Sequence, residues 1–409
     1  MVNEYCISSE KASDLFVGLR FHEGIPEVVF PHGFVISQDE KQCRKDILRL
    51  LTVLQRFSHQ EDGTSVRDKD NLLSRLPLSS YQYVILDYLM HGYYTEKEIR
   101  YYQSQRGKIN WKRTIQMENP QIDGDNLVYL DYQVRKNEVN NRTLLTEIHR
   151  YCVYESFRLF GWLYFPSEVT PQKPQIPFNK DMFLSVLSDA IQNTFDDTKT
   201  RLFQSMVNIV IAESETYDSR NAVLGVNRFD PVWEGLIDYV FGEDNKDQFF
   251  PHATWTIIQN GIISKSSPLL PDTIMRSDEK IYVLDAKYYQ YGISYDPSDL
   301  PQTSSIQKQI TYGKHISGQG VVPKGSVYNA FIMPFAADIK ASPYRFVSVG
   351  TADWEKYTPE TLNYAYVLGV LLDTRWLLTN YSKHNNLEIE RLAELIEGSL
   401  ASYKAMVGL

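Results

Sequence analysis

The segment from Pro271 to Tyr288 restricts the possible folds of this chain more than any other stretch. A polar turn over residues 277–280 separates two short apolar runs, and this pattern predicts a β-hairpin. The second run alternates, which places four side chains on one face of a strand. They are Ile281, Val283, Asp285 and Lys287. The apolar pair of this face requires a core, while the carboxylate and the amine at its end point together toward a polar site, which Asp272 can reach across the hairpin.

Two carboxylates and a lysine at one point carry a specific chemistry. With the backbone carbonyl of Ala286, the side chains of Asp272 and Asp285 form an oxygen-rich cage of the kind that holds Mg²⁺. Lys287 beside it can orient or deprotonate a water for attack on a phosphodiester. The alternative is a surface hairpin whose Asp and Lys form an exposed ion pair worth about 0–1 kcal/mol. The sequence around the hairpin is needed to distinguish these two interpretations.

Composition indicates an ordinary globular protein of two or three domains, because the 409 residues are 43% hydrophobic and 23% charged. We expect no membrane association, since no apolar run approaches the ~20 residues that span a bilayer and the N-terminus lacks a signal pattern. Three cysteines without paired spacing predict a reducing, cytoplasmic compartment and argue against a disulfide framework or a cysteine zinc site. The net charge of −9 argues against strong unaided DNA binding and favours recruitment by a partner.

The N-terminal half predicts an α+β domain. Short strands are expected within residues 1–35, a polar loop over 58–76, and longer strands at 107–115 and 127–136. Amphipathic or buried helices are expected at 41–57, 81–93 and 146–163, and a capping box of Thr95 and Glu98 predicts another at 95–105. His149 is expected to be a hydrogen-bonded core residue.

Basic residues in this half offer candidate contacts to DNA or to a partner. Trp111 could stack on a base, although packing in a core is favoured. The candidates are Lys108, Trp111, Lys112 and Arg113. A basic stripe on the helix 41–57 is favoured as a solvated face.

Residues 166–179 contain four prolines and no periodicity, which predicts a linker. We therefore expect an N-terminal recognition or docking domain at 1–165 and a second domain at 180–409. In the second domain the pattern predicts helices at 180–213, 231–241 and 304–316, and closing helices at 360–381 and 387–406. Strands are expected at 252–259, 326–335 and 344–351, besides the hairpin. This order predicts an α/β fold with a mixed sheet flanked by helices.

The order of these elements around Asp272, Asp285 and Lys287 resembles the PD-(D/E)XK nuclease superfamily. The resemblance implies a Mg²⁺-dependent nuclease, with Mn²⁺ as an alternative ion. It implies further that Glu234, in the helix before the hairpin, is a metal ligand or lies behind one. Gln309 and Tyr312, in the helix after it, would order the site.

More of the chain resembles the LlaJI family of restriction endonucleases, in the phrases VFPHGF, GKINWKRTI, IHRYCVYESF, DPVWEGLIDYVFG and SIQKQITYG. That family is related to McrC, the nuclease subunit of a machine driven by an AAA+ GTPase, McrB. The resemblance implies double-stranded DNA as substrate and a cognate methyltransferase in the same system. Because the chain contains no G-x-x-x-x-G-K-[ST] stretch, a GTPase would be a separate polypeptide.

Three functions remain open on the sequence. The chain is a nuclease subunit recruited by a motor, or a stand-alone type II endonuclease that recognises DNA through residues 1–165. The third is a catalytically silent DNA-binding or scaffold subunit, against which the intact Asp272, Asp285 and Lys287 argue. Cutting of both strands requires two active sites, so a homodimer on DNA is also expected.

Overall fold

The computed structural model describes residues 2–10, 15–57, 76–124, 126–140, 142–166, 169–215, 222–259, 261, 263–337, 345–353 and 362–408. The chain forms two compact units. Unit 1 is discontinuous and consists of Met1–Ser74 and Arg220–Leu409, while unit 2 is the intervening Arg75–Ser219. The predicted linker at 166–179 therefore lies inside unit 2, and the first 74 residues belong with the C-terminal half.

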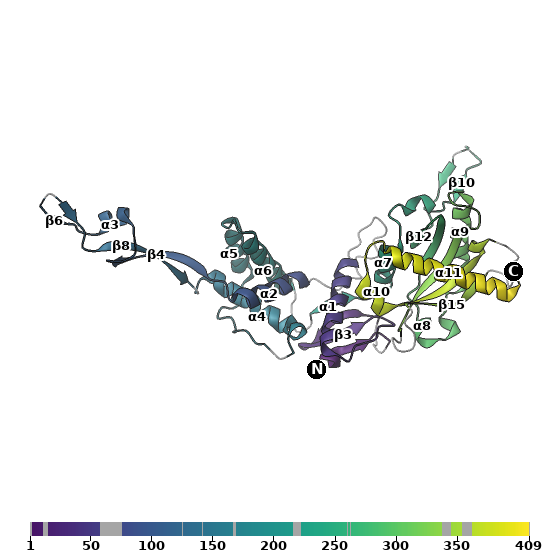
Figure 1. Cartoon of the computed structure of the whole chain (residues 1–409), viewed down its shortest axis with the longest axis horizontal. Helices are drawn as coiled ribbons and strands as arrows, with labels where there is room; N and C mark the ends of the chain where they lie inside the picture. The colour runs from purple at the N-terminus through teal and green to yellow at the C-terminus, as the bar shows by residue number, and fades with distance from the viewer. Residues whose placement is uncertain are drawn as a thin grey trace. The chain divides into compact units, whose positions relative to one another are not determined.

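A mixed five-stranded sheet forms the centre of unit 1 (Figure 1). Its order is β12-β13-β14-β16-β15, with parallel pairs β13–β14 and β14–β16 and an antiparallel strand at each edge. The mixed α/β architecture predicted from the sequence is confirmed. The strands are β12 (Thr273–Ser277), β13 (Lys280–Ala286), β14 (Val327–Phe335), β15 (Phe346–Asp353) and β16 (Tyr366–Asp373).

Helices cover both faces of this sheet because its strands alternate between two apolar sets of side chains. Ile281 and Val283 pack in one buried cluster with Tyr312 and Ile316 of α9 (Thr303–Gly318). The opposite face meets α11 (Asn386–Val407), where the Tyr282 hydroxyl donates to the Glu397 carboxylate. The helix before the sheet, α7 (Asp230–Phe241), packs against β12 and β13 and ends at Gly242 as predicted.

The predicted hairpin is confirmed. Strands β12 and β13 pair from Thr273 opposite Leu284 to Ser277 opposite Lys280, and Asp278 in the turn has a φ of +51°. Antiparallel pairing places the start of β12 beside the end of β13. Asp272, immediately before β12, is thereby brought to the level of Asp285.

A four-stranded sheet of order β1-β3-β2-β9 ties the N-terminal segment into unit 1. Its strands are β1 (Cys6–Ser8), β2 (Val17–His22), β3 (Ile25–Phe30) and β9 (Val223–Val226). Helix α1 (Glu40–Phe57) packs on α7 and on α10 (Thr374–Asn380), and an Arg375 guanidinium donates to the buried Asp46 at 2.6 Å. The strands expected within residues 1–35 are present, but they complete unit 1 instead of starting a separate domain.

Unit 2 contains packed helices and a small sheet of order β4-β8-β5. The helices are α2 (Leu78–His91), α4 (Leu144–Tyr164), α5 (Lys180–Gln192) and α6 (Asp197–Glu215). The sheet is formed by β4 (Glu96–Ser104), β5 (Lys108–Ile109) and β8 (Tyr132–Asn140), next to α3 (Trp111–Met117) and the hairpin of β6 (Gln121–Asp123) and β7 (Asn126–Val128). The predicted helices 41–57, 81–93, 146–163, 231–241, 304–316 and 387–406 are confirmed as α1, α2, α4, α7, α9 and α11, and the helical run predicted at 180–213 is confirmed as α5 and α6.

Three sequence predictions about secondary structure are wrong. The helix expected at 95–105 is strand β4, which pairs along its full length with β8, so cross-strand pairing overrides a local capping signal. The strand expected at 107–115 continues for two residues only, because Asn110 accepts from the Arg113 N–H at 3.1 Å and starts α3. The helix expected at 360–381 is present only as α10; β16, a mostly buried apolar strand, precedes it, and apolar runs of this kind do not distinguish helix from strand by periodicity.

Two further predictions are corrected in detail. The strand expected at 252–259 is shorter, β10 (Thr254–Thr256), and pairs with β11 (Ile263–Lys265) in a separate two-stranded sheet. The strand expected at 127–136 is divided between β7 and β8. The loop predicted at 58–76 lies, apart from residue 76, outside the described residues. Within the part of the chain that is described, no helix has the length and apolar character to cross a membrane.

Candidate active site

The three residues singled out in the hairpin meet at one edge of the central sheet. One carboxylate oxygen of Asp272 accepts the backbone N–H of Ala286 at 3.0 Å. The Lys287 Nζ donates to the Asp285 carboxylate at 2.9 Å. Asp272 and Asp285 also interact through a hydrogen bond between their side chains. The main-chain register of the hairpin therefore fixes two carboxylates and one amine against each other.

Burial and mutual repulsion govern the charges of this group. The pKa of Asp272 is raised well above its usual range, first by burial, then by the hydrogen bond and the charge of Asp285. Burial alone would lower the pKa of Lys287, but the ion pair with Asp285 and the nearby Asp272 outweigh it and raise that pKa. In the absence of a cation Asp272 therefore holds its proton more tightly than an exposed aspartate does.

Glu234 lies close to this group without a direct bond to it. It is half-buried on α7 and lines the same cleft as Ala286 and Lys287. Burial raises its pKa to about 7, and Asp230 adds to the shift. The structure thus brings Glu234 to the site as predicted, as an acid that keeps its proton at a pH where an exposed glutamate would be ionised.

Gln309 and Tyr312 attach α9 to the two chain segments that carry the carboxylates. The buried Gln309 amide donates to the Val283 carbonyl at 2.6 Å, two residues before Asp285. The Tyr312 hydroxyl donates to the Leu270 carbonyl at 3.0 Å, two residues before Asp272. Both side chains hold backbone, and neither is bonded to Lys287.

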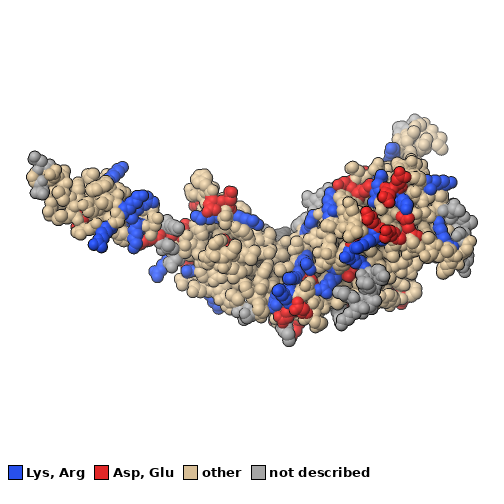
Figure 2. Space-filling view, viewed as in Figure 1, with Lys and Arg blue, Asp and Glu red and all other residues tan. Residues whose placement is uncertain are grey.

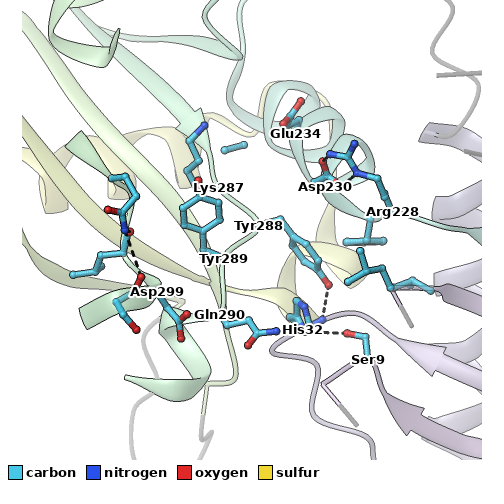
Figure 3. A pocket seen from close by; sticks show the side chains of 17 residues that line it. Ser9, His32, Arg228, Asp230, Glu234, Lys287, Tyr288, Tyr289, Gln290 and Asp299 are labelled. Atoms are coloured by element: carbon cyan, nitrogen blue, oxygen red, sulfur yellow. Dashed lines mark hydrogen bonds and ion pairs between the residues drawn. The ribbon is translucent and has the colours of Figure 1, made fainter. Parts of the chain in front are cut away.

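A cleft of about 650 Å³ opens beside Lys287 and Glu234 (Figure 3). Arg228 and Asp230, which form an ion pair, lie on its wall. Ser9 and His32 of the N-terminal segment also line it. Sequence reasoning missed all four. Asp230 lies one helical turn before Glu234, a spacing that could have indicated it, whereas Ser9 and His32 gave no local signal.

Sequence reasoning also missed Lys308. Its amine hydrogen-bonds Tyr312 and interacts electrostatically with Asp285 and Asp272. The i, i+4 spacing of Lys308 and Tyr312 is the signal that could have found it.

The basic candidates of the N-terminal half lie in unit 2. Trp111 is 54% exposed and packs edge to face on Tyr132 with ring centroids 5.5 Å apart, so the favoured core position was wrong. The Arg113 guanidinium lies 4.7 Å from the centroid of the Tyr101 ring. Lys108 and Lys112 are exposed on the same small sheet and helix. Figure 2 shows several Lys and Arg side chains over this part of unit 2, whereas both charge signs are interspersed over unit 1.

The donor set fits Mg²⁺ better than a metal held wholly by side chains. Among the described residues, no three His, Cys, Asp or Glu side chains are grouped tightly enough to form a complete ligand set. Mg²⁺ keeps several waters and is commonly bound through one or two carboxylates. Burial and then the adjacent Asp285 raise the pKa of Asp272, and a divalent cation held by the two carboxylates would offset their repulsion.

Comparisons of this sequence with known sequences agree with a restriction system. The chain is 27% identical over 364 residues to the type II restriction enzyme BsuMI component YdjA of Bacillus subtilis (strain 168), covering 78% of this chain and 75% of that protein. A solved half-complex of Thermococcus gammatolerans McrB AAA+ hexamers with bound McrC aligns over 93% of this chain and 83% of the solved one. Its identity is 12% and its TM-score 0.37, too low to support an argument. The sequence model for LlaJI restriction endonucleases matches residues 16–355, and the chain therefore belongs to the LlaJI restriction endonuclease family.

Proposed function

We propose that this protein is a restriction nuclease whose unit 1 hydrolyses DNA phosphodiester bonds in a Mg²⁺-dependent reaction. The observation that carries the proposal is the meeting of Asp272, Asp285 and Lys287 at one end of the hairpin. The family to which the chain belongs consists of restriction endonucleases. A PD-(D/E)XK type of active site is the chemistry that this side-chain set supports.

Asp272 and Asp285 would hold the cation, with the Ala286 carbonyl as a further ligand and Mn²⁺ as an alternative ion. When bound, the metal neutralises the charge that develops on the attacked phosphate. Lys287, whose amine donates to Asp285, would orient the attacking water. Glu234, protonated up to about pH 7, would exchange a proton in the cleft or serve as a metal ligand or as a group behind one. Gln309 and Tyr312 fix the backbone on which the ligands are carried.

The direct test is cleavage of plasmid DNA by Asp285→Ala and Lys287→Ala variants with Mg²⁺. We expect each to lose at least about 100-fold in rate, as expected for loss of a group that stabilises the transition state. The matched control is the exposed ion pair of Asp244 and Lys383, 2.8 Å apart, whose alanine variants should cut normally. Wild-type rates from both site variants would exclude this active site.

We further propose that the protein acts with a second polypeptide. Two observations support a partner: the similar Bacillus subtilis protein is named a component, and the net charge of −9 is unfavourable for unaided DNA binding. An AAA+ GTPase of the McrB kind is the partner that the sequence resemblance suggests, with a cognate methyltransferase to protect host DNA. The exposed residues Lys108, Trp111, Lys112 and Arg113 are candidate contacts to that partner or to DNA.

The test is cleavage by the purified chain alone and together with the products of the adjacent genes, with and without GTP. Cutting that needs the second protein and GTP supports the motor-dependent subunit. Cutting by the chain alone, unchanged by either, supports a stand-alone endonuclease, for which a homodimer on DNA is expected. DNA binding without cutting under every condition would support the silent scaffold instead.

A further inference from the structure

We propose that Tyr288 is a positioning residue for Lys287, and that the N-terminal VFPHGF loop completes the active site by holding the Tyr288 hydroxyl. This inference rests on the proposed function, because it assigns a role in the same reaction. The VFPHGF loop, expected from the sequence to belong to a recognition or docking domain, then forms part of the active site.

Lys287 is the first residue beyond β13, so the strand no longer fixes its direction on its own. Its backbone N–H donates to the Ile332 carbonyl at 2.9 Å, and the same carbonyl accepts from the Trp233 indole at 3.2 Å. Trp233 precedes Glu234 on α7, so one carbonyl joins the backbone of Lys287 to the helix that carries Glu234. These two hydrogen bonds fix the position of the Lys287 backbone but not the direction of the chain after it.

Tyr288 provides that orientation. It points away from Lys287 into the space between α7 and the N-terminal sheet (Figure 3). Its ring stacks on His32 with centroids 4.8 Å apart and contacts Phe229 and Trp233 at 5.2 and 6.1 Å. Its hydroxyl accepts the backbone N–H of His32 at 2.6 Å and hydrogen-bonds the Ser9 side chain. The Tyr289 backbone N–H donates to the Lys287 carbonyl at 2.8 Å, so the chain turns tightly at Tyr288, and holding the Tyr288 side chain holds the backbone that it shares with Lys287.

The loop that holds Tyr288 is itself firmly held. The His32 carbonyl accepts from the Thr374 hydroxyl at 2.9 Å, and the His32 imidazole is 3.0 Å from the Ser9 hydroxyl. The next residue, Gly33, has a φ of +70°, and a Cβ there would lie 2.7 Å from the Phe335 backbone. Tyr288 is therefore bound to a loop seated against the end of β14, not to a flexible terminus.

The decisive variant is Tyr288→Phe, which removes one oxygen and leaves the ring. Its matched control is Tyr282→Phe on β13, which removes a hydroxyl bonded to Glu397 of α11. Two quantities are measured on the full-length chain: single-turnover cleavage with DNA affinity, and hydrogen exchange of the His32 amide. The exchange measurement does not depend on catalysis.

We expect Tyr288→Phe to lower the single-turnover rate by about 10- to 100-fold without changing DNA affinity, because Lys287 loses its fixed orientation. The His32 amide should exchange at least about 10-fold faster in this variant and unchanged in Tyr282→Phe.

Two results would overturn the inference: unchanged exchange at His32 in Tyr288→Phe, or faster exchange with wild-type cleavage. A wild-type protein that never cuts, with exchange behaving as expected, would instead overturn the proposed function and the positioning role with it. In that case the contact between Tyr288 and the VFPHGF loop would stand as a structural one.

Discussion

The carboxyl group of Glu234 carries a pH dependence that can be measured without any substrate. Its pKa is about 7 in the folded chain and 4.5 in a solvated one, with burial as the main cause. Between these values the folded state holds a proton that the unfolded state has released, so the free energy of unfolding falls as pH rises from about 4.5 to about 7. We expect Glu234→Gln, which cannot ionise, to lose this component of the pH dependence.

The measurement is the melting temperature of wild type and Glu234→Gln from pH 4 to pH 8 without divalent cations. The variant should match wild type at the acidic end and exceed it above pH 7. Comparison with the variant is needed because burial also raises the pKa of Glu213, in unit 2, to about 7. Parallel curves for the two proteins would contradict the prediction.

Gln309 is a buried amide, and its loss should lower the free energy of unfolding. In Gln309→Ala the Val283 carbonyl loses its 2.6 Å donor, and a buried unsatisfied carbonyl costs about 1–3 kcal/mol. Urea unfolding should detect this, with a lower cleavage rate because Val283 precedes Asp285 by two residues. Gln307 is exposed on the same helix, so Gln307→Ala should change stability by less than about 0.5 kcal/mol.

At the scale of elements, the close packing of the VFPHGF loop against β14 can be tested with two glycines, of which Gly24 serves as the control. Gly33 and Gly24 both have positive φ, at +70° and +89°. An alanine at Gly24 meets nothing within 4 Å, whereas at Gly33 its Cβ would lie 2.7 Å from the Phe335 backbone. We expect Gly24→Ala to cost about 1–2 kcal/mol from backbone strain alone, and Gly33→Ala to cost more.

Chemical denaturation of the two variants tests this difference. An equal loss of stability in the two variants would mean that the VFPHGF loop does not pack closely against β14. The Gly33→Ala variant should also cut DNA more slowly under native conditions, because the loop displaced by the new Cβ carries the donor to Tyr288.

The elements that sequence predicted well are those with local signals. The hairpin, α7 and α9 are set by alternation, caps and turns within a few residues, and they carry Asp272, Asp285, Lys287, Glu234 and Gln309. The capping box that favoured a helix at 95–105 was overridden by pairing with a strand about 40 residues later in the chain. The contact of Tyr288 with His32 joins residues 256 apart, and nothing in either neighbourhood indicates it. Local patterns thus predicted the carboxylates and the amine of the candidate site, while its N-terminal wall depends on long-range packing.

At the scale of the whole molecule, the discontinuity of unit 1 determines which fragments of the chain should fold. The sequence predicts a boundary at 166–179. A fragment of residues 180–409, however, lacks the VFPHGF loop and the strand β2 that pairs with β9. We expect a fragment of residues 180–409 to be unfolded or aggregated. A chain in which a short flexible linker replaces residues 75–219 should instead fold cooperatively and bind Mg²⁺.

Circular dichroism melts and calorimetric titration of Mg²⁺ compare the two fragments directly. A well-folded 180–409 fragment that binds the ion would show that the N-terminal segment is dispensable. Loss of partner-dependent cutting in the linker version, with its fold intact, would assign docking or recognition to unit 2.

The pairing of β2 with β9 also has a consequence during synthesis on the ribosome. Arg20 is opposite Val223, so about 200 residues must be translated before β2 gains this neighbour. At about 5–20 residues per second, the nascent strand waits roughly 10 to 40 s with one edge unpaired. Throughout that interval the growing polypeptide exposes a strand edge to which chaperones can bind and through which nascent chains can aggregate.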